Sequence, residues 1–407
     1  MNKYIKNTCL FFWFTATLNA QVFNKGDFYV SSNVILSVYD DLINSTGSEL
    51  VNNGDLYLFQ NLTNDGSFGF NAGQNTSMLN FVGDITQAID GVGITNVFDM
   101  EFNNSSGSFA FSLDKEVNIF GTLFFQEGII HETTNGILSF KTNATYENLS
   151  TQSYVNNRVR KLGNNSFVFP VGDYQGAVFI PREARITTLG NIDDQFSVAF
   201  NWANSDVSFS HAEKEASIGL INMNEFWEIN REIGSSNASI TLTWNSITTP
   251  DFISSNIDEM IIVRWNGVEW VNEGGVVNVN NNEITTTVSE YGVFTLANKS
   301  NENTPPDLDF SDSFSPDGDG INDVFVVPGL AEEYPNFKMK IYNRYGSVVY
   351  DYKNNGNLNP LWWNGKAKKS VVISGNNQTA PASTYWYIIY FNDGVTKPYQ
   401  GWLYLNK

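Results

Sequence analysis

A run of acidic residues and glycines near the carboxyl end of the chain is the segment best suited to binding a metal ion. Residues 315–323 read Ser-Pro-Asp-Gly-Asp-Gly-Ile-Asn-Asp. Carboxylates separated by glycines let a loop curl around a hard cation such as Ca²⁺, and Asp317, Asp319 and Asp323 are the candidate ligands. The charged ligands that begin and end an EF-hand loop are replaced here by Ser and Val. Because Asp and Asn beside Gly also form Asx-turns without metal, a calcium loop and a metal-free turn both remain open, and no other cofactor is indicated.

Side chains that could catalyse polysaccharide cleavage are few. Such a site needs paired groups with separated proton affinities in a cleft. Asp99, Glu101 and Glu127 are candidates, but their spacing is that of solvated strand residues. The two histidines, His131 and His211, lack a nucleophile motif such as Gly-x-Ser-x-Gly. The sequence therefore predicts no catalytic site and no enzyme, with a polysaccharide-active enzyme as the alternative.

Two further groups of side chains could bind ligands. Trp265 and Trp270 flank an Asn-Gly turn, and such a pair either stacks on sugar rings or caps a small core. Arg158, Arg160 and Lys161 form a basic cluster that we interpret as charge-balancing surface residues. The chain carries 43 acidic and 23 basic residues, a formal net charge of −20, which argues against nucleic acid as a partner.

The first 20 residues predict a cleaved secretory signal. Lys3 and Lys6 precede an apolar run at residues 9–14, and small residues end at Ala20. The run is shorter than the ~20 residues of a membrane-spanning helix. We therefore expect export to the periplasm and a mature chain without cysteine, because Cys9 is the only one.

The remaining chain predicts an all-β protein, because short alternating runs are separated by Asn-Gly, Asp-Gly and Gly-Gly turns. Between residues 21 and 176 the runs have four or five residues, which fits stacked rungs that bury their inner faces against their neighbours. We predict a parallel β-helix-like solenoid there. Residues 97–104, 117–123 and 128–140 resemble the degenerate repeats of Bacteroidetes surface proteins.

Longer alternating strands follow in residues 177–298, which predicts a middle β-sandwich of immunoglobulin-like size. The expected strands cover residues 196–202, 225–230, 239–244, 260–265, 283–288 and 292–297. Residues 299–308 are polar with a Pro-Pro step, and we predict that they form a linker.

Residues 309–407 predict a small β-sandwich, since residues 338–342, 348–350 and 384–391 read as strands joined by turns. The segment also carries a set of motif residues in its turns and strands: Phe314, Pro316, Asp317, Gly318, Asp319, Gly320, Asn322, Asp323, Asn343, Arg344, Gly346, Trp363, Gly365, Pro381, Thr384, Tyr385 and Gly401. In these residues the segment is similar to the gliding motility-associated C-terminal domain of Bacteroidetes, the type B sorting domain of the type IX secretion system. Ser383 stands where the family usually has Gly.

The resemblance implies export by the type IX translocon with a PorP/SprF-family outer-membrane protein as partner. It implies a secreted protein or one on the outer cell surface. For residues 21–300 the leading hypothesis is a non-catalytic adhesin or gliding-associated protein that binds a surface polysaccharide or protein. The alternatives are the polysaccharide-active enzyme and an accessory subunit bound to the translocon.

Overall fold

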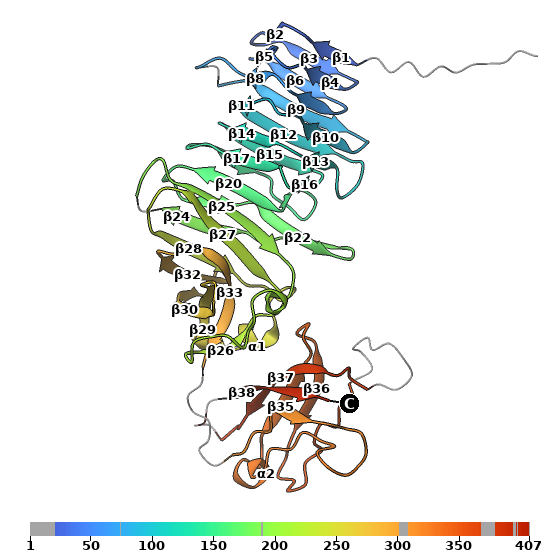
Figure 1. The fold of residues 1–407 in the computed structure, drawn as a ribbon, viewed down its shortest axis with the longest axis vertical. Helices are drawn as coiled ribbons and strands as arrows, with labels where there is room; N and C mark the ends of the chain where they lie inside the picture. The colour runs from blue at the N-terminus through green and yellow to red at the C-terminus, as the bar shows by residue number, and fades with distance from the viewer. Residues whose placement is uncertain are drawn as a thin grey trace, which may run out of the picture.

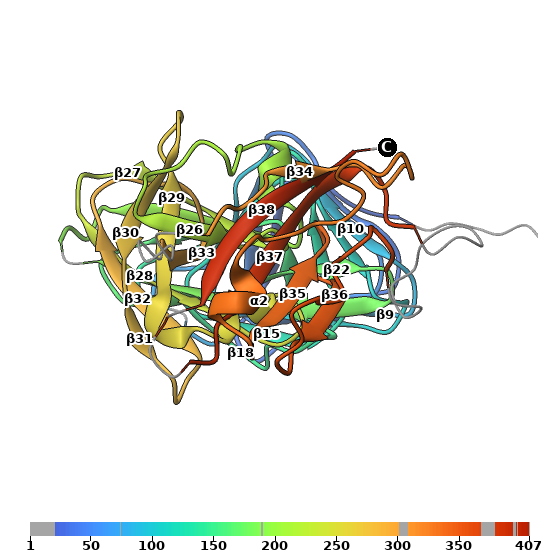
Figure 2. The same cartoon turned by 90° about the horizontal axis from the view of Figure 1, so that it is seen from below.

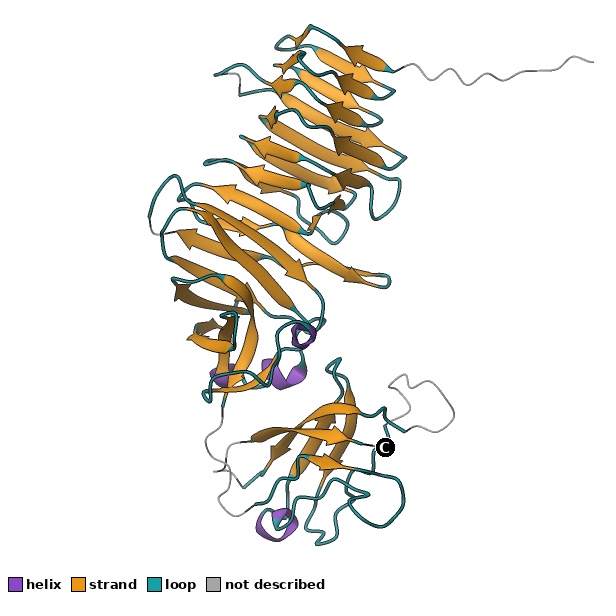
Figure 3. Ribbon diagram, viewed as in Figure 1, coloured by secondary structure: helices purple, strands orange, loops and turns teal. Residues whose placement is uncertain are grey.

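The computed structural model describes residues 21–73, 75–188, 190–300, 308–367, 379–393, 396 and 398–406. The predicted signal and residues 301–307 of the predicted linker lie outside these ranges. The described chain is almost entirely β (Figure 3), which confirms the predicted all-β class. A solenoid, a middle region of antiparallel strands and a carboxy-terminal sheet follow one another along the long axis (Figure 1). No helix among the described residues is long and apolar enough to cross a membrane.

Three sheets wrap around one core to form a solenoid of about seven turns, which confirms the β-helix-like prediction. The first sheet contains the parallel strands β1 (Val22–Asn24), β4 (Leu42–Asn44), β7 (Leu62–Asn64), β10 (Gln87–Asp90), β13 (Phe111–Leu113), β16 (Ile130–Glu132), β19 (Val155–Asn156) and β22 (Val171–Gln175). The second contains β2 (Asp27–Val30), β5 (Glu49–Asn52), β8 (Ser67–Gly69), β11 (Thr95–Val97), β14 (Glu116–Ile119), β17 (Ile137–Phe140) and β20 (Arg158–Leu162). The third contains β3 (Ile35–Val38), β6 (Asp55–Leu58), β9 (Met78–Gly83), β12 (Asp99–Asn104), β15 (Thr122–Glu127) and β18 (Thr145–Glu147).

Inward side chains of successive turns lie in register, which explains how such short strands form a stable body. In the first sheet Val22 pairs with Leu42, Leu42 with Leu62, and Leu62 with Ile89. Leu42, Leu62 and Ile89 are fully buried. Each turn therefore buries its inner face against the turns before and after it, and stacking stabilises the whole solenoid.

An asparagine ladder lies at the corner between the first and second sheets. Asn44 accepts a hydrogen bond from Asn24 (2.8 Å) and donates one to Asn64 (2.7 Å). Its Nδ2 also donates to the Ser67 carbonyl at 3.0 Å. These buried amides are thus paired within the stack, as buried polar groups must be. The side-chain amides of these asparagines therefore bind one turn of the solenoid to the next.

The carboxyl side of the solenoid continues directly into the middle region. β20 pairs with the next strand in antiparallel fashion, so the second sheet changes direction without breaking. It continues through β25 (Gln195–Asn201), β27 (Phe226–Ile233), β33 (Gly292–Lys299), β29 (Met260–Trp265) and β30 (Trp270–Gly274), with β26 (Ile218–Ile221) beside β33. The first sheet ends in an antiparallel hairpin of β22 and β23 (Val178–Pro181).

A second antiparallel sheet in the middle region shares the solenoid's core. It contains β21 (Phe167–Phe169), β24 (Ala184–Thr188), β28 (Ala238–Thr243), β32 (Glu283–Val288) and β31 (Val276–Asn278). Three short helices lie in the connections: η1 (Ser205–Val207), α1 (Asp251–Ser254) and η2 (Ile257–Glu259). The six predicted strands correspond to β25, β27, β28, β29, β32 and β33. The immunoglobulin-like topology and the boundaries of the middle region stay predictions.

The carboxy-terminal region forms one described five-stranded sheet. Its strand order is β34 (Ser313–Phe314), β38 (Tyr399–Leu405), β37 (Ser383–Tyr390), β35 (Lys338–Tyr342) and β36 (Val348–Lys353). Figure 2 shows these strands side by side, with α2 (Leu330–Glu333) near one end. One face covers a separate core that includes Phe325, Trp363 and Leu403. The second sheet of the predicted sandwich is not among the described strands, so the sandwich stays a prediction.

Candidate functional site

Several of the sequence-predicted motif residues come together in the core of the carboxy-terminal region. The rings of Phe314 and Trp363 lie 5.1 Å apart, and those of Trp363 and Tyr385 lie 5.0 Å apart at a steep angle. All three side chains are buried. The Tyr385 hydroxyl donates a hydrogen bond to the Pro381 carbonyl at 2.8 Å. These motif residues thus form the fold itself, because aromatic packing of this kind contributes most of the burial in a small domain.

At two motif positions glycine is needed because neighbouring atoms lie too close for a Cβ atom. A Cβ on Gly401 would lie 2.4 Å from the Tyr387 hydroxyl oxygen on the neighbouring strand. Gly365 has a φ of 74°, and a Cβ there would lie 3.0 Å from a side-chain carbon of Pro316. A side chain at either position would displace a neighbour or strain the backbone.

The motif residues Asn343, Arg344 and Gly346 form the turn between β35 and β36. The Asn343 side chain accepts hydrogen bonds from the backbone N–H groups of Tyr345 (2.9 Å) and Ser347 (3.0 Å). Gly346 has a φ of 71°, and the Arg344 guanidinium lies over the Tyr345 ring. Thr384 lies in β37 opposite Tyr404. The Asn-x-x-Gly spacing is therefore explained by turn geometry.

The acidic loop carries its own hydrogen bonds. Asp323 accepts the N–H groups of Gly318 (2.7 Å) and Gly320 (3.0 Å), one on each carboxylate oxygen. Asp317 accepts the N–H of Asp319 at 3.1 Å, and Asp319 in turn accepts that of Ile321 at 2.8 Å. The bonds to Asp317 and Asp319 are the Asx-turns of the metal-free interpretation, whereas Asp323 accepts from N–H groups that precede it in the loop.

The same loop brings the three candidate cation ligands together. One carboxylate oxygen from each of Asp317, Asp319 and Asp323 lies within 4.8 Å of the others. Asn322 and the two intervening glycines adopt positive φ, which turns the loop back on itself. The Ser315 N–H donates to the Asn322 carbonyl at 2.9 Å and closes the loop. The three carboxylates already accept hydrogen bonds from backbone N–H groups of the same loop. Calcium binding stays a prediction.

Comparison with known families identifies this region. Residues 308–405 match the family model of the CHU_C type IX secretion signal domain. The chain carries a type IX secretion signal domain. The domain supports export by the type IX secretion system, interaction with the secretion machinery, and a secreted or surface location. No curated protein and no solved structure matches the chain.

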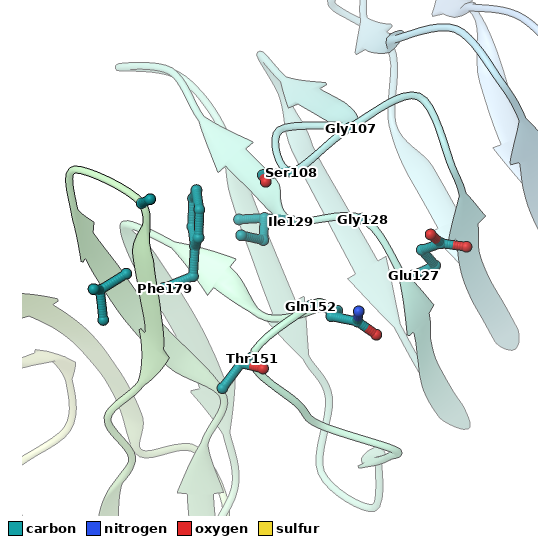
Figure 4. Close-up of a pocket in the computed structure, with 10 residues that line it drawn as sticks. Gly107, Ser108, Glu127, Gly128, Ile129, Thr151, Gln152 and Phe179 are labelled. Atoms are coloured by element: carbon teal, nitrogen blue, oxygen red, sulfur yellow. The ribbon is translucent and has the colours of Figure 1, made fainter.

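Outside the secretion signal domain, a groove of about 490 Å³ opens where the β22–β23 hairpin leaves the solenoid (Figure 4). Phe179 of the hairpin supplies apolar surface, and Ser108, Thr151 and Gln152 supply hydroxyl and amide groups. Ile129 of the solenoid also lines the groove but is buried. Figure 4 shows the Phe179 ring standing beside Ile129, with Thr151 and Gln152 in the neighbouring loop. A concave site with an apolar wall and a few polar groups is the usual form of a ligand site.

An aromatic cluster extends the groove onto the outer surface. The rings of Tyr174 and Phe179 are stacked with centroids 5.6 Å apart, and Phe109 lies 4.7 Å from Tyr174. Tyr174 is 41% exposed. Sequence reasoning did not identify these residues, because they come from a solenoid turn and a hairpin far apart in the chain. The signal that could have found them is the aromatic pair at both ends of the short Tyr174–Phe179 hairpin turn.

The three candidate catalytic carboxylates lie in strands β12 and β15. Each has a different environment in the described part of the chain. Asp99 accepts the Thr122 N–H at 2.6 Å, and burial raises the pKa of its carboxyl. Glu101 accepts a hydrogen bond from the exposed Asn103. Glu127 lines the groove described above. Asp99 thus bridges adjacent turns of the third sheet.

The two histidines have different surroundings. His131 is exposed and its Nδ1 lies 2.9 Å from the Asn156 side-chain oxygen. His211 is buried, and its Nε2 lies 2.8 Å from the Ser205 hydroxyl. Asp206 accepts the backbone N–H of His211 at 2.7 Å. Because Ser205 is only 1% exposed, this Ser–His contact offers no route for a substrate to the hydroxyl and is a structural bond.

The tryptophan pair and the basic cluster also have structural roles. Trp265 and Trp270 lie directly opposite each other across the β29–β30 hairpin, with centroids 5.8 Å apart. Trp270 is fully buried and its indole N–H donates to the Phe209 carbonyl at 3.1 Å. The pair therefore caps a core, one of the two possibilities in the sequence.

Arg160 of the basic cluster is paired with Glu116 and Glu232, which lie two strands away on either side in the same sheet. The surface interpretation is wrong for Lys161, which is buried and donates to the Thr142 carbonyl at 2.7 Å.

Proposed function

We propose that this chain is a non-catalytic adhesin or gliding-associated binding protein, which the type IX secretion system delivers to the outer cell surface or the medium. The secretion signal domain at residues 308–405 carries the proposal. A signal peptide at residues 1–20 takes the chain to the periplasm first. The translocon and a PorP/SprF-family outer-membrane protein then act as export partners.

The groove at the β22–β23 hairpin is the proposed binding site, and its ligand is a neutral surface polysaccharide. The stacked rings of Tyr174 and Phe179 offer an apolar platform for a sugar ring. Gln152, Thr151 and Ser108 offer hydrogen-bond donors and acceptors for its hydroxyl groups. The formal net charge of −20 disfavours an acidic polymer. A protein ligand is the second possibility at the same groove.

Export is tested by deleting residues 308–407 and locating the remaining chain by cell fractionation and protease accessibility. We expect the shortened chain to accumulate in the periplasm and the intact chain to reach the surface or the medium. A second variant that lacks residues 1–20 tests the export to the periplasm. We expect this variant to stay in the cytoplasm. Unchanged surface delivery of the shortened chain would contradict the export role of the domain.

Binding is tested on a panel of neutral and acidic polysaccharides with the exported chain and its Phe179→Ala variant. Loss of one stacking ring should weaken binding at least tenfold, which corresponds to about 1.4 kcal/mol. Phe120→Ala is the matched control, because Phe120 is an exposed aromatic residue of the solenoid outside the groove. Release of reducing or unsaturated ends by the unchanged chain would instead favour the polysaccharide-active enzyme.

A further inference from the structure

His131 lies on the outer face of the first sheet of the solenoid, next to the proposed binding groove. It is the middle residue of β16, and it is exposed although its neighbours Ile130 and Glu132 are buried. Its ring meets the ring of Phe109 at a steep angle, with centroids 5.9 Å apart. The Phe109 ring in turn lies 5.8 Å from the ring of Phe179, which lines the groove. His131 and the groove are therefore joined through one aromatic ring.

A network of hydrogen bonds holds the His131 ring in one orientation. Its Nδ1 lies 2.9 Å from Oδ1 of Asn156, its register partner on β19. Asn156 Nδ2 donates to the Gly172 carbonyl at 3.2 Å and to Oδ1 of Asp173 at 3.0 Å. The backbone N–H of Trp202 donates to the second carboxylate oxygen of Asp173 at 2.9 Å. The network thus runs from His131 to the β22–β23 hairpin that forms one wall of the groove.

The network also fixes which nitrogen of His131 carries the proton. Because Nδ2 of Asn156 faces two acceptors, its Oδ1 faces the histidine, and an amide oxygen only accepts. Nδ1 of His131 must therefore be the donor, which leaves Nε2 of the neutral ring as an acceptor. Among the described residues, Nε2 has no hydrogen-bond partner. His131 thus presents an unused acceptor on the surface beside the groove.

A structural role explains one end of the His131 ring and not the other. Asn156 is only 8% exposed, so its amide oxygen needs a donor, and Nδ1 supplies one. That need ends at Nδ1. It leaves an exposed ring whose second nitrogen is held in place by the same network. Fixed polar groups beside an apolar surface are what give a ligand site its specificity.

We propose that His131 is a ligand-binding residue whose Nε2 accepts a hydrogen bond from a hydroxyl group of the polysaccharide. The inference rests on the proposed binding of a neutral polysaccharide at the groove, and it extends that site onto the outer face of the first sheet. The two centroid distances place the rings of His131 and Phe179 at most about 12 Å apart, so one extended sugar chain reaches both. An ionised carboxylate has no proton to donate to this acceptor, which agrees with a neutral ligand.

Two substitutions separate binding from packing. His131→Phe keeps a ring against Phe109 and removes both nitrogens, whereas His131→Gln removes the ring and keeps a hydrogen-bonding amide at the end of the side chain. Affinities of the exported chains for cellohexaose, mannohexaose and maltohexaose are measured by calorimetry, and circular dichroism checks the fold. We expect His131→Phe to weaken binding about three- to tenfold, the range for one neutral hydrogen bond, and His131→Gln to weaken it less. The opposite order would overturn the proposal.

Nitrogen NMR reads the same atom in the unchanged chain. The chain has two histidines, so a sample labelled with nitrogen-15 histidine and purified without a histidine tag gives two imidazole rings. His211→Gln identifies the signals of His131. In alkaline buffer, where free imidazole is neutral, we expect Nε2 to be the unprotonated nitrogen and its resonance to move when a hexaose binds. Asn156→Ala should let the proton exchange between the two nitrogens. An Nε2 that carries the proton in the unchanged chain, or that does not respond to a bound hexaose, overturns the proposal.

The outcomes separate this inference from the proposed function. Binding that is lost in Phe179→Ala and unchanged in His131→Phe overturns the role of His131 and keeps the groove as the site. Absence of binding of all three hexaoses to the unchanged chain overturns both. Weaker binding in Phe179→Ala and His131→Phe, with Nε2 responding to the hexaose, supports both.

Discussion

The ring of Phe252 in α1 meets the ring of Tyr342 in β35, with centroids 5.6 Å apart and planes at 69°. The contact joins the middle region to the secretion signal domain. Trp386 and Ile388 on the same face of the sheet are buried in the core cluster that includes Phe252. The secretion signal domain is therefore docked on the protein that it exports.

Tyr342→Lys should separate the two regions, because a charge at this buried contact would be unpaired. We expect a larger radius of gyration by small-angle X-ray scattering and faster proteolysis between residues 300 and 308. Tyr345→Lys is the matched control, since Tyr345 is in the adjacent turn and 65% exposed. Equal effects of the two substitutions would contradict docking through Tyr342.

Asn104→Ala should destabilise the solenoid much more than Asn103→Ala. Asn104 is fully buried and donates to the side-chain oxygen of Gln87 (2.8 Å) and to the Ile85 carbonyl (2.7 Å). Its loss leaves the buried Gln87 oxygen unpaired and removes the bond to the part-buried Ile85 carbonyl, at about 2–4 kcal/mol in the free energy of unfolding. Asn103 points outward from the same strand, so its loss should cost less than about 0.5 kcal/mol. Urea unfolding followed by circular dichroism measures both, and similar midpoints would rule out a stabilising role for the buried amide.

The Arg182–Glu225 ion pair should matter far more than Arg185–Glu283. Glu225 is fully buried and accepts two hydrogen bonds from Arg182, at 2.8 and 2.9 Å. Glu225→Ala leaves a buried guanidinium without its partner, and we expect a loss of about 3–5 kcal/mol. Glu283→Ala breaks a pair in which Arg185 is partly exposed, and it should cost at most about 1 kcal/mol. The thermal unfolding of Glu225→Ala and of Glu283→Ala, each compared with the unchanged chain, distinguishes these cases. A small effect of Glu225→Ala would show that solvent reaches Arg182.

His211 should make the stability of the middle region fall on acidification. Burial lowers its pKa to about 4, while Asp206 raises it and Lys214 lowers it further. Between the unfolded pKa of ~6.5 and the folded value, the unfolded chain binds a proton that the folded chain does not, so stability decreases as pH falls. The loss over this window should reach about 3 kcal/mol. His211→Gln should remove this part of the pH dependence, whereas His131→Gln at an exposed position should leave it in place.

Asp323→Ala should lower the melting temperature of the secretion signal domain even in EDTA. The exposed Gly318 and Gly320 N–H groups lose their carboxylate acceptor and bind water instead, which costs about 0.5–1.5 kcal/mol. The calcium hypothesis adds that millimolar Ca²⁺ raises the melting temperature of the unchanged chain and not of Asp319→Ala. A melting temperature that is the same in EDTA and calcium would contradict calcium binding.

The amino-acid sequence by itself determined the β class, the solenoid and the secretion signal domain. Period-two runs such as residues 338–342 and the Asn-Gly turns are local features, so strands and turns can be predicted from a few adjacent residues. The motif residues of the secretion signal domain were identifiable because their turn and close-packing roles restrict the residue type. Gly401, which faces the Tyr387 hydroxyl, is an example.

Only the tertiary structure decided which strands pair and which surfaces remain open. Alternation assigns a residue to a face of a strand but not to a neighbour, so the pairing of Arg160 with Ser197 could not be inferred from local pattern. The same holds for the groove between Ile129 and Phe179, and for the contact of Phe252 with Tyr342. Each joins segments far apart in the chain, and such contacts depend on how the whole chain packs.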